Sequence, residues 1–220
     1  MKKYELTKEA IKVEGKKLYR IRAIVDFGDT KAGDLGGYIE GKKNLDQYGN
    51  AWVSGDARVY NDAFVTEGAR VYGDAEVSGD ATVSGGARVS GDARVSGDAR
   101  VSGGARVSGD AQVCGNARVC GDARVSGGAR VSGDARVYGN ARVFGNARVC
   151  GDAQVCGNVW VRGDAQVCGN ARVYGDAQYA YAHGFGSVNR TTTFFRLKDG
   201  GVGVSCGCFY GTIQEFKDKV

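Results

Sequence analysis

The chain has 220 residues, with 37 glycines, no proline and a formal net charge of +5 at pH 7. None of its Leu and Ile residues lies between Ala51 and Ala177, which excludes a conventional aliphatic core for most of the chain. Abundant Val, Ala and aromatic residues argue against disorder. No apolar stretch is long enough to span a bilayer, and the charged start lacks the apolar region of a secretory signal. The sequence therefore predicts a cytoplasmic protein without a membrane segment.

The first predicted element is a hairpin over residues 10–25, in which Glu14-Gly15-Lys16-Lys17 forms the turn between two alternating runs. Residues 28–48 are a glycine-rich connector. Because a solenoid exposes an unpaired strand edge at each end, we expect residues 1–48 to form an N-terminal cap.

A six-residue unit, Val-x-Gly-(Asp/Asn/Gly)-Ala-x, then runs without insertion from Ala51 to Ala177. Its turn position is glycine except at Asn61 and Glu67. A period of six excludes a helix, and it fits short strands with an inward Val, a sharp Gly-Asp corner and a small inward Ala. Three units make an 18-residue triangular coil. The predicted fold is an all-β solenoid of about seven coils over residues 49–180.

This pattern resembles the hexapeptide repeat of left-handed parallel β-helix proteins. That fold hosts acyltransferases, carbonic anhydrases and non-enzymatic solenoids, often as trimers, so the resemblance implies the fold far more than an activity. Residues 24–39 (IVDFGDTKAGDLGGYI) are similar to the lead-in of bacterial and prophage members of this group, which are often labelled acetyltransferases. Residues 186–209 are similar to a small terminal module of phage-encoded repeat proteins. Both similarities imply a mobile-element origin.

The last region, residues 181–220, is predicted as a small ββα cap. Thr191–Leu197 and Val202–Phe209 form its hairpin around Asp199-Gly200. A short helix follows, with Thr212 and Glu215 in a capping box.

The 18-residue period stacks five arginines in one outward file between two tryptophans. A guanidinium ladder of this kind could grip a polyanion or an acidic protein surface. The alternative is that the corner residues Asp74, Asp92 and Asp110 compensate these arginines. Residues 51–178 carry 14 basic and 14 acidic side chains, and this neutrality favours compensation and disfavours nucleic acid as the partner. The predicted binding residues of the file are Arg70, Arg88, Arg106, Arg124, Arg142, Trp52 and Trp160.

Five of the seven cysteines occupy a position of the repeat that most often holds Ser. The period makes Cys150 and Cys168 stacked neighbours. Without an export signal we expect reduced thiols. Metal binding is not predicted, because a flat file does not converge four ligands.

Two further candidates lie beyond the repeat. His183 is the only histidine, and the resemblance implies that an acyltransferase of this fold would use a histidine as general base with an acyl-CoA such as acetyl-CoA. A carbonic anhydrase is excluded, since its zinc needs three histidines. The polar run around Ser187, Asn189 and Arg190 could coordinate a phosphate or carboxylate, or it could simply begin a strand rich in threonine.

The function predicted from the sequence is that of a rigid, non-enzymatic protein of phage or prophage type without a cofactor. It would engage a host macromolecule or sequester an anionic ligand, in a role consistent with counter-defence, and it could form a homo-oligomer such as a dimer or trimer. The alternatives are an acyl-CoA-dependent acyltransferase and a structural, self-assembling solenoid.

Overall fold

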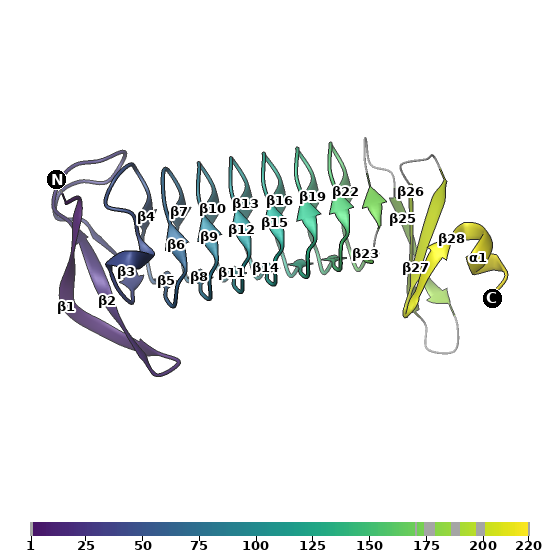
Figure 1. Cartoon of the computed structure of the whole chain (residues 1–220), viewed down its shortest axis with the longest axis horizontal. Coiled ribbons are helices and arrows are strands. Elements are labelled where there is room, and N and C mark those ends of the chain that lie inside the picture. The colour runs from purple at the N-terminus through teal and green to yellow at the C-terminus, as the bar shows by residue number, and fades with distance from the viewer. Residues whose placement is uncertain (1, 170, 174–178, 186–189, 197–200, 220) are drawn as a thin grey trace.

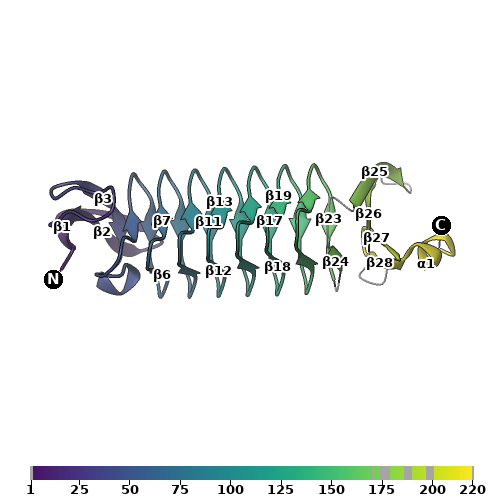
Figure 2. The ribbon, with the colours of Figure 1, turned by 90° about the horizontal axis from the view of Figure 1, so that it is seen from above.

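Two-residue strands recur every six residues from Trp52 to Val173 and stack into the three faces of a rod (Figures 1 and 2). The computed structural model describes residues 2–169, 171–173, 179–185, 190–196 and 201–219. Each strand pairs in parallel with the strand 18 residues away, as Arg88 pairs with Arg106 and Val89 with Val107. The fold is therefore the parallel β-solenoid that the sequence predicts.

Each face contains seven of these short strands, and the faces are numbered I to III in chain order. Face I consists of β4 (Trp52–Val53), β7 (Arg70–Val71), β10 (Arg88–Val89), β13 (Arg106–Val107), β16 (Arg124–Val125), β19 (Arg142–Val143) and β22 (Trp160–Val161). Face II consists of β5 (Arg58–Val59), β8 (Glu76–Val77), β11 (Arg94–Val95), β14 (Gln112–Val113), β17 (Arg130–Val131), β20 (Arg148–Val149) and β23 (Gln166–Val167). Face III consists of β6 (Phe64–Val65), β9 (Thr82–Val83), β12 (Arg100–Val101), β15 (Arg118–Val119), β18 (Arg136–Val137), β21 (Gln154–Val155) and β24 (Arg172–Val173).

The core is a column of Val and Ala side chains. Every repeat Val from Val53 to Val173 has no exposed surface, and the Ala residues between Ala51 and Ala171 are equally covered, as is Val159 in the one Ala position that departs from the pattern. The strand after each corner returns a small side chain to the interior, where a larger one would overfill the triangle. The exterior is left to the polar positions on either side of each Val.

The corners explain why glycine recurs at the turn position. The corner glycines from Gly55 to Gly169 have φ between 62° and 82°, a region that side-chain-bearing residues avoid. A Cβ added to Gly91 would also lie 3.0 Å from the backbone nitrogen of Gly109 in the next coil. Asn61 and Glu67 adopt the same left-handed conformation, each with φ of 61°, so the turn is kept where glycine is replaced.

The hydrogen bonds at the ends of each pair of strands run from the earlier coil to the later one. The amide of Arg88 donates to the carbonyl of Ala105 and that of Ser90 to Val107, each at 2.9 Å. The first coil is thus left with carbonyl groups that lack a preceding donor, and the last coil with N–H groups that lack a following acceptor. Buried backbone groups of this kind need partners, and these come from the two ends of the chain.

The N-terminal end is a hairpin of β1 (Tyr4–Val13) and β2 (Lys16–Ala23), followed by β3 (Leu35–Ile39) and the 3-10 helix η1 (Lys42–Asn44). The hairpin begins earlier than the predicted residue 10, and Glu14 and Gly15 form its two-residue turn with positive φ. Strand β3 pairs antiparallel with β2 and parallel with β5. With a parallel bridge from Leu45 to Val65, it adds part of an eighth coil to the seven predicted.

The N-terminal end supplies the donors that the first coil lacks. The buried side chain of Asn44 donates from Nδ2 to the carbonyls of Asn61 and Ala63, at 2.9 Å each. The ammonium group of Lys3 donates to the carbonyl of Ala51 at 2.8 Å. Burial lowers the pKa of Lys3 to about 8, and Asp46 opposes part of this shift.

The C-terminal end is an antiparallel sheet of β25 (Tyr179–Phe185), β26 (Arg190–Arg196), β27 (Val202–Cys206) and β28 (Phe209–Thr212), with helix α1 (Ile213–Lys217). The sheet has two more strands than the predicted hairpin, because β25 and β28 add to its edges. The capping box of Thr212 and Glu215 is confirmed. In the described part of the chain, no helix is both long and apolar enough to cross a bilayer.

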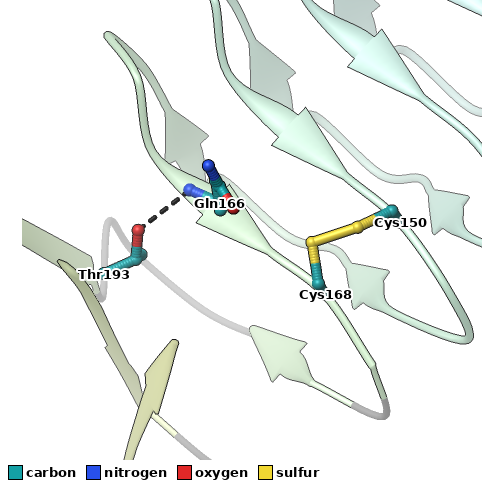
Figure 3. Close-up of a disulfide and its surroundings, with 4 residues drawn as sticks. All are labelled: Cys150, Gln166, Cys168 and Thr193. Atoms are coloured by element: carbon teal, nitrogen blue, oxygen red, sulfur yellow. Dashed lines mark hydrogen bonds between the residues drawn. A yellow bond between two sulfur atoms is a disulfide. The ribbon is translucent and has the colours of Figure 1, made fainter. Parts of the chain in front are cut away.

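The C-terminal sheet supplies a hydrogen-bond acceptor for the last coil and apolar side chains that cover the end of the core. The hydroxyl of Thr193 accepts the N–H of Gln166 in the last coil on face II at 2.9 Å (Figure 3). Phe195 is 1% exposed and belongs to the same buried cluster as the Val column. The ring of Tyr210 stacks on Phe195 with their centroids 5.9 Å apart. The open end of the core is therefore closed by aromatic side chains.

Candidate functional site

Face I carries an uninterrupted file of five arginines, here called the arginine ladder (Arg70, Arg88, Arg106, Arg124 and Arg142). Their strands β7, β10, β13, β16 and β19 follow one another along the rod (Figure 1). Each arginine pairs in register with the next, from Trp52 opposite Arg70 to Arg142 opposite Trp160. At the strand spacing of a sheet, the Cα atoms of successive arginines lie about 4.8 Å apart.

The middle of the ladder is open to solvent. Arg88, Arg106 and Arg124 are exposed, and within residues 2–169 none of them forms an ion pair with a carboxylate. The ion pair that the ladder does make joins Arg70 to Asp29, with Nη2 and Oδ2 2.8 Å apart. The interpretation that corner aspartates such as Asp92 compensate these arginines by pairing is therefore wrong for the middle of the ladder.

The two tryptophans at its ends differ, although the repeat places them in equivalent positions. Trp52 is 6% exposed. The ring of Phe27 packs edge-on against it with the centroids 5.3 Å apart, and Tyr4 packs from the N-terminal hairpin at 6.5 Å. Trp52 thus lies on the outer side of its strand, in register with Arg70 as predicted, but it is not exposed like the middle arginines, because the connector folds back over it.

Trp160 has the exposed environment that the sequence predicts. It is 42% exposed, the guanidinium carbon of Arg142 lies 5.1 Å from the centroid of its ring, and Phe144 contacts it edge-on at 6.3 Å. A guanidinium over an indole face is a favourable cation–π arrangement. This end of the ladder is a surface platform of one cation and two rings.

At the Trp52 end the connector and the ladder line an open-sided pocket of about 340 Å³. The size is within the range of small-molecule sites. The side chains that line it are Asp29, Trp52, Ser54, Arg70, Tyr72 and Arg88. Sequence reasoning singled out three of these residues and missed Asp29, Ser54 and Tyr72. The 18-residue period could have placed Ser54 and Tyr72 beside the file, but no periodic signal brings Asp29 to it.

The predicted sites beyond the repeat are only partly described. Ser187 and Asn189 lie outside the described residues. His183 lies in β25 and Arg190 begins β26 opposite Phe185, but the side chains of both lie outside the described part of the chain. The acyltransferase alternative therefore stays a prediction, as does coordination of an anion by the 187–190 run.

The cysteines depart from the expectation of fully reduced thiols. Cys150 and Cys168 are stacked neighbours, as the period predicts, and they form a disulfide between the last two coils of face II (Figure 3). Cys114, Cys120, Cys156, Cys206 and Cys208 are free. Burial raises the pKa of the Cys120 thiol, which keeps it protonated and a poor nucleophile.

The metal alternative gains no ligand cluster from the described residues. Across the described ranges, His, Cys, Asp and Glu side chains form no group of three or more that could hold a metal ion. The sequence predicted no metal site, and the described side chains supply no ligand set to propose one.

One comparison with known proteins bears on the repeat. A family model described as the YdcK beta solenoid repeat matches eight stretches of the chain. The matches cover residues 75–91, 87–103, 93–109, 111–127, 117–133, 129–142, 135–151 and 165–179. The chain is a β-solenoid repeat protein. None of the curated proteins compared with it matches.

Proposed function

We propose that this solenoid is a non-catalytic binding protein that recognises an acidic surface of a partner protein through the arginine ladder. The observation that carries the proposal is the run of Arg88, Arg106 and Arg124, which are exposed, in register and not paired with carboxylates among the residues described around them. A cation without an internal partner is available to an external one.

The rod fixes the backbone positions of these cations. The hydrogen bonds between coils hold the strands in register, so the spacing of the arginine Cα atoms is set before a partner arrives. Arginine is suited to such a surface, because its planar fork binds a carboxylate through two hydrogen bonds. A pre-organised array lowers the ordering cost of binding, and its charge speeds the encounter with an acidic partner.

The neighbouring corner favours a protein over a nucleic acid. Asp56, Asp74, Asp92 and Asp110 occupy successive coils at the corner between faces I and II, and all four are exposed. A nucleic acid bound along the ladder would place its phosphates next to these aspartates, which would repel them. A folded protein with mixed surface charge can place carboxylates on the arginines and basic groups beside the aspartates.

The predicted setting belongs to the same proposal. The similarity of residues 24–39 and 186–209 to mobile-element proteins supports a host protein as the partner, in a counter-defence role. A hexapeptide-repeat origin, a cytoplasmic location and assembly into a homo-oligomer stay predictions of the same kind.

A capture experiment with matched charge reversals tests the proposal. One bait carries Arg88→Glu, Arg106→Glu and Arg124→Glu on face I, and the control carries Arg100→Glu, Arg118→Glu and Arg136→Glu, which also stack in register on face III. We expect wild type and the face III control to retain a bacterial protein that the face I variant loses. Retention of the same protein by the face I variant would refute the ladder as its binding site, and release by nuclease would assign the ladder to nucleic acid instead.

A further inference from the structure

The pocket at the Trp52 end of face I combines two cations on adjacent coils with an open aromatic ring. Arg70 and Arg88 pair in register on β7 and β10, so their Cα atoms lie one strand spacing apart. Both guanidinium groups can therefore reach one anionic group. Arg88 is exposed and makes no ion pair within residues 2–169. The N–H groups of Arg70 that do not bond Asp29 remain available to a ligand.

Asp29 gives the cationic side of the pocket a defined shape. Its carboxylate holds Nη2 of Arg70 at 2.8 Å. The connector also approaches Arg70 closely at Gly28, where an added Cβ would lie 3.4 Å from Nη2. Arg70 is therefore oriented by the connector, whereas Arg88 is free to adjust to a ligand.

The aromatic side of the pocket consists of a fixed ring and an open one. Trp52 is held beneath by Phe27 and Tyr4. Gly36 allows this packing, since a Cβ there would lie 2.7 Å from Cζ2 of the indole. Tyr72 lies in the same pocket with 39% of its surface exposed. A planar ligand ring can stack on such a side chain.

We propose that this pocket binds a small anion that carries an aromatic ring, with its phosphate or carboxylate on Arg70 and Arg88 and its ring against Tyr72. The hydroxyl of Ser54 adds a hydrogen-bonding group to the same pocket. This site shares Arg88 with the acidic-protein site proposed for the middle of the ladder, but neither proposal requires the other. A nucleoside monophosphate has the required chemistry and serves as the probe.

Trp52 provides the readout. The chain has two tryptophans, so a Trp160→Phe variant leaves Trp52 as the single indole, at the wall of the pocket. Titration with adenosine monophosphate is expected to change Trp52 emission in a saturable way, with adenosine and inorganic phosphate each binding about tenfold more weakly. No saturable change at concentrations on the order of 1 mM would overturn the proposal. Equal affinity for inorganic phosphate would overturn the assignment of a ring to the ligand.

Matched variants separate the pocket from general charge attraction. In the same background, Arg88→Gln is expected to weaken adenosine monophosphate binding by about tenfold or more. Arg124→Gln makes the same change on the same file, but Arg124 does not line the pocket, so its affinity should not change. An equal loss in both would refute a defined site.

Two substitutions at Tyr72 test the ring. Tyr72→Phe should retain binding and Tyr72→Ser should weaken it several-fold. Equal affinity in these two variants would refute stacking. Arg88 belongs to both proposed sites and Arg124 to the ladder alone, so weaker adenosine monophosphate binding in Arg88→Gln but not in Arg124→Gln assigns that binding to the pocket. Failure of the ladder is measured separately, by the capture experiment.

Discussion

The two ends of the rod are covered by opposite hydrogen-bonding groups, side-chain donors at the N-terminal end and a side-chain acceptor at the C-terminal end. At the N-terminal end the first coil presents carbonyl groups, and Asn44 and Lys3 cover them with donors. At the C-terminal end the last coil presents N–H groups, and Thr193 covers one with an acceptor. The difference follows from the hydrogen bonds at the ends of the short strands, whose donors lie in the earlier coil and whose acceptors lie in the later one.

The same contrast extends to face I. The N-terminal connector folds over Trp52 and forms one wall of the pocket, whereas the C-terminal sheet leaves Trp160 on the surface beside Arg142. A cap can thus shape a pocket as well as protect an edge. Substitutions at the two ends should therefore change the free energy of unfolding by different amounts and disturb different coils.

The largest effect is expected at the buried donor of the N-terminal end. Asn44→Ala leaves the carbonyls of Asn61 and Ala63 without their side-chain donor and should lower the free energy of unfolding by about 3 kcal/mol or more. Asn140→Ala is the matched control, because Asn140 is exposed and bonds the side chain of Asn158. Chemical denaturation of both variants checks this. Equal stability would contradict the capping role.

The disulfide should stabilise one end only. Replacing Cys150 and Cys168 by Ser is expected to cost about 3 kcal/mol, from a closed loop of 18 residues. Hydrogen exchange should speed up in β20 and β23 and stay unchanged in β5. Cys114→Ser, in the same file, is the control and should have little effect. Alkylation of the unreduced protein should spare Cys150 and Cys168, and modification of all seven cysteines would show that the bond is absent.

A smaller effect is expected at the acceptor of the C-terminal end. Thr193→Val preserves the shape of the side chain but removes the oxygen that accepts the Gln166 N–H, which should cost about 1 to 2 kcal/mol. Thr82→Val, at a half-buried strand position of face III, should change stability by less than about 0.5 kcal/mol. If Thr193→Val proved more damaging than Asn44→Ala, the contrast between the two ends would be wrong.

The last effect depends on pH and concerns the proton of Lys3. Its pKa in the folded protein is lowered to about 8 from 10.5 by burial, so between these values the unfolded chain binds more protons than the folded one. The free energy of unfolding of the wild type should therefore rise with pH in this window relative to Lys3→Met. NMR titration of the Lys3 side chain measures the pKa directly. A value near 10.5 would contradict the buried environment.

The sequence predicted the rod because a period of six holds the backbone conformation at every corner. Even the two substituted turn positions, Asn61 and Glu67, keep the left-handed φ that glycine supplies elsewhere. The 18-residue register likewise placed Arg88 beside Arg106 and Cys150 beside Cys168. Local repetition is enough to predict such neighbours.

The sequence did not predict what the non-repeating segments do. Trp52 and Trp160 occupy equivalent positions of the repeat. The N-terminal hairpin and connector, through Tyr4 and Phe27, cover the first and leave the second exposed. For the same reason the pocket residue Asp29 could not be found from periodicity. The roles of Asn44 and Thr193 depend on the direction of the hydrogen bonds between coils, which no single residue reveals.

Residue-resolved NMR of the arginine side chains tests the central claim most directly. Poly-L-glutamate serves as a defined acidic probe, and the Nε–Hε signals of the faces are compared during its titration. The account predicts saturable shifts at Arg88, Arg106 and Arg124, with much smaller shifts at Arg100, Arg118 and Arg136. Equal shifts on faces I and III, or larger shifts on face III, would contradict the assignment of the ladder as the binding surface.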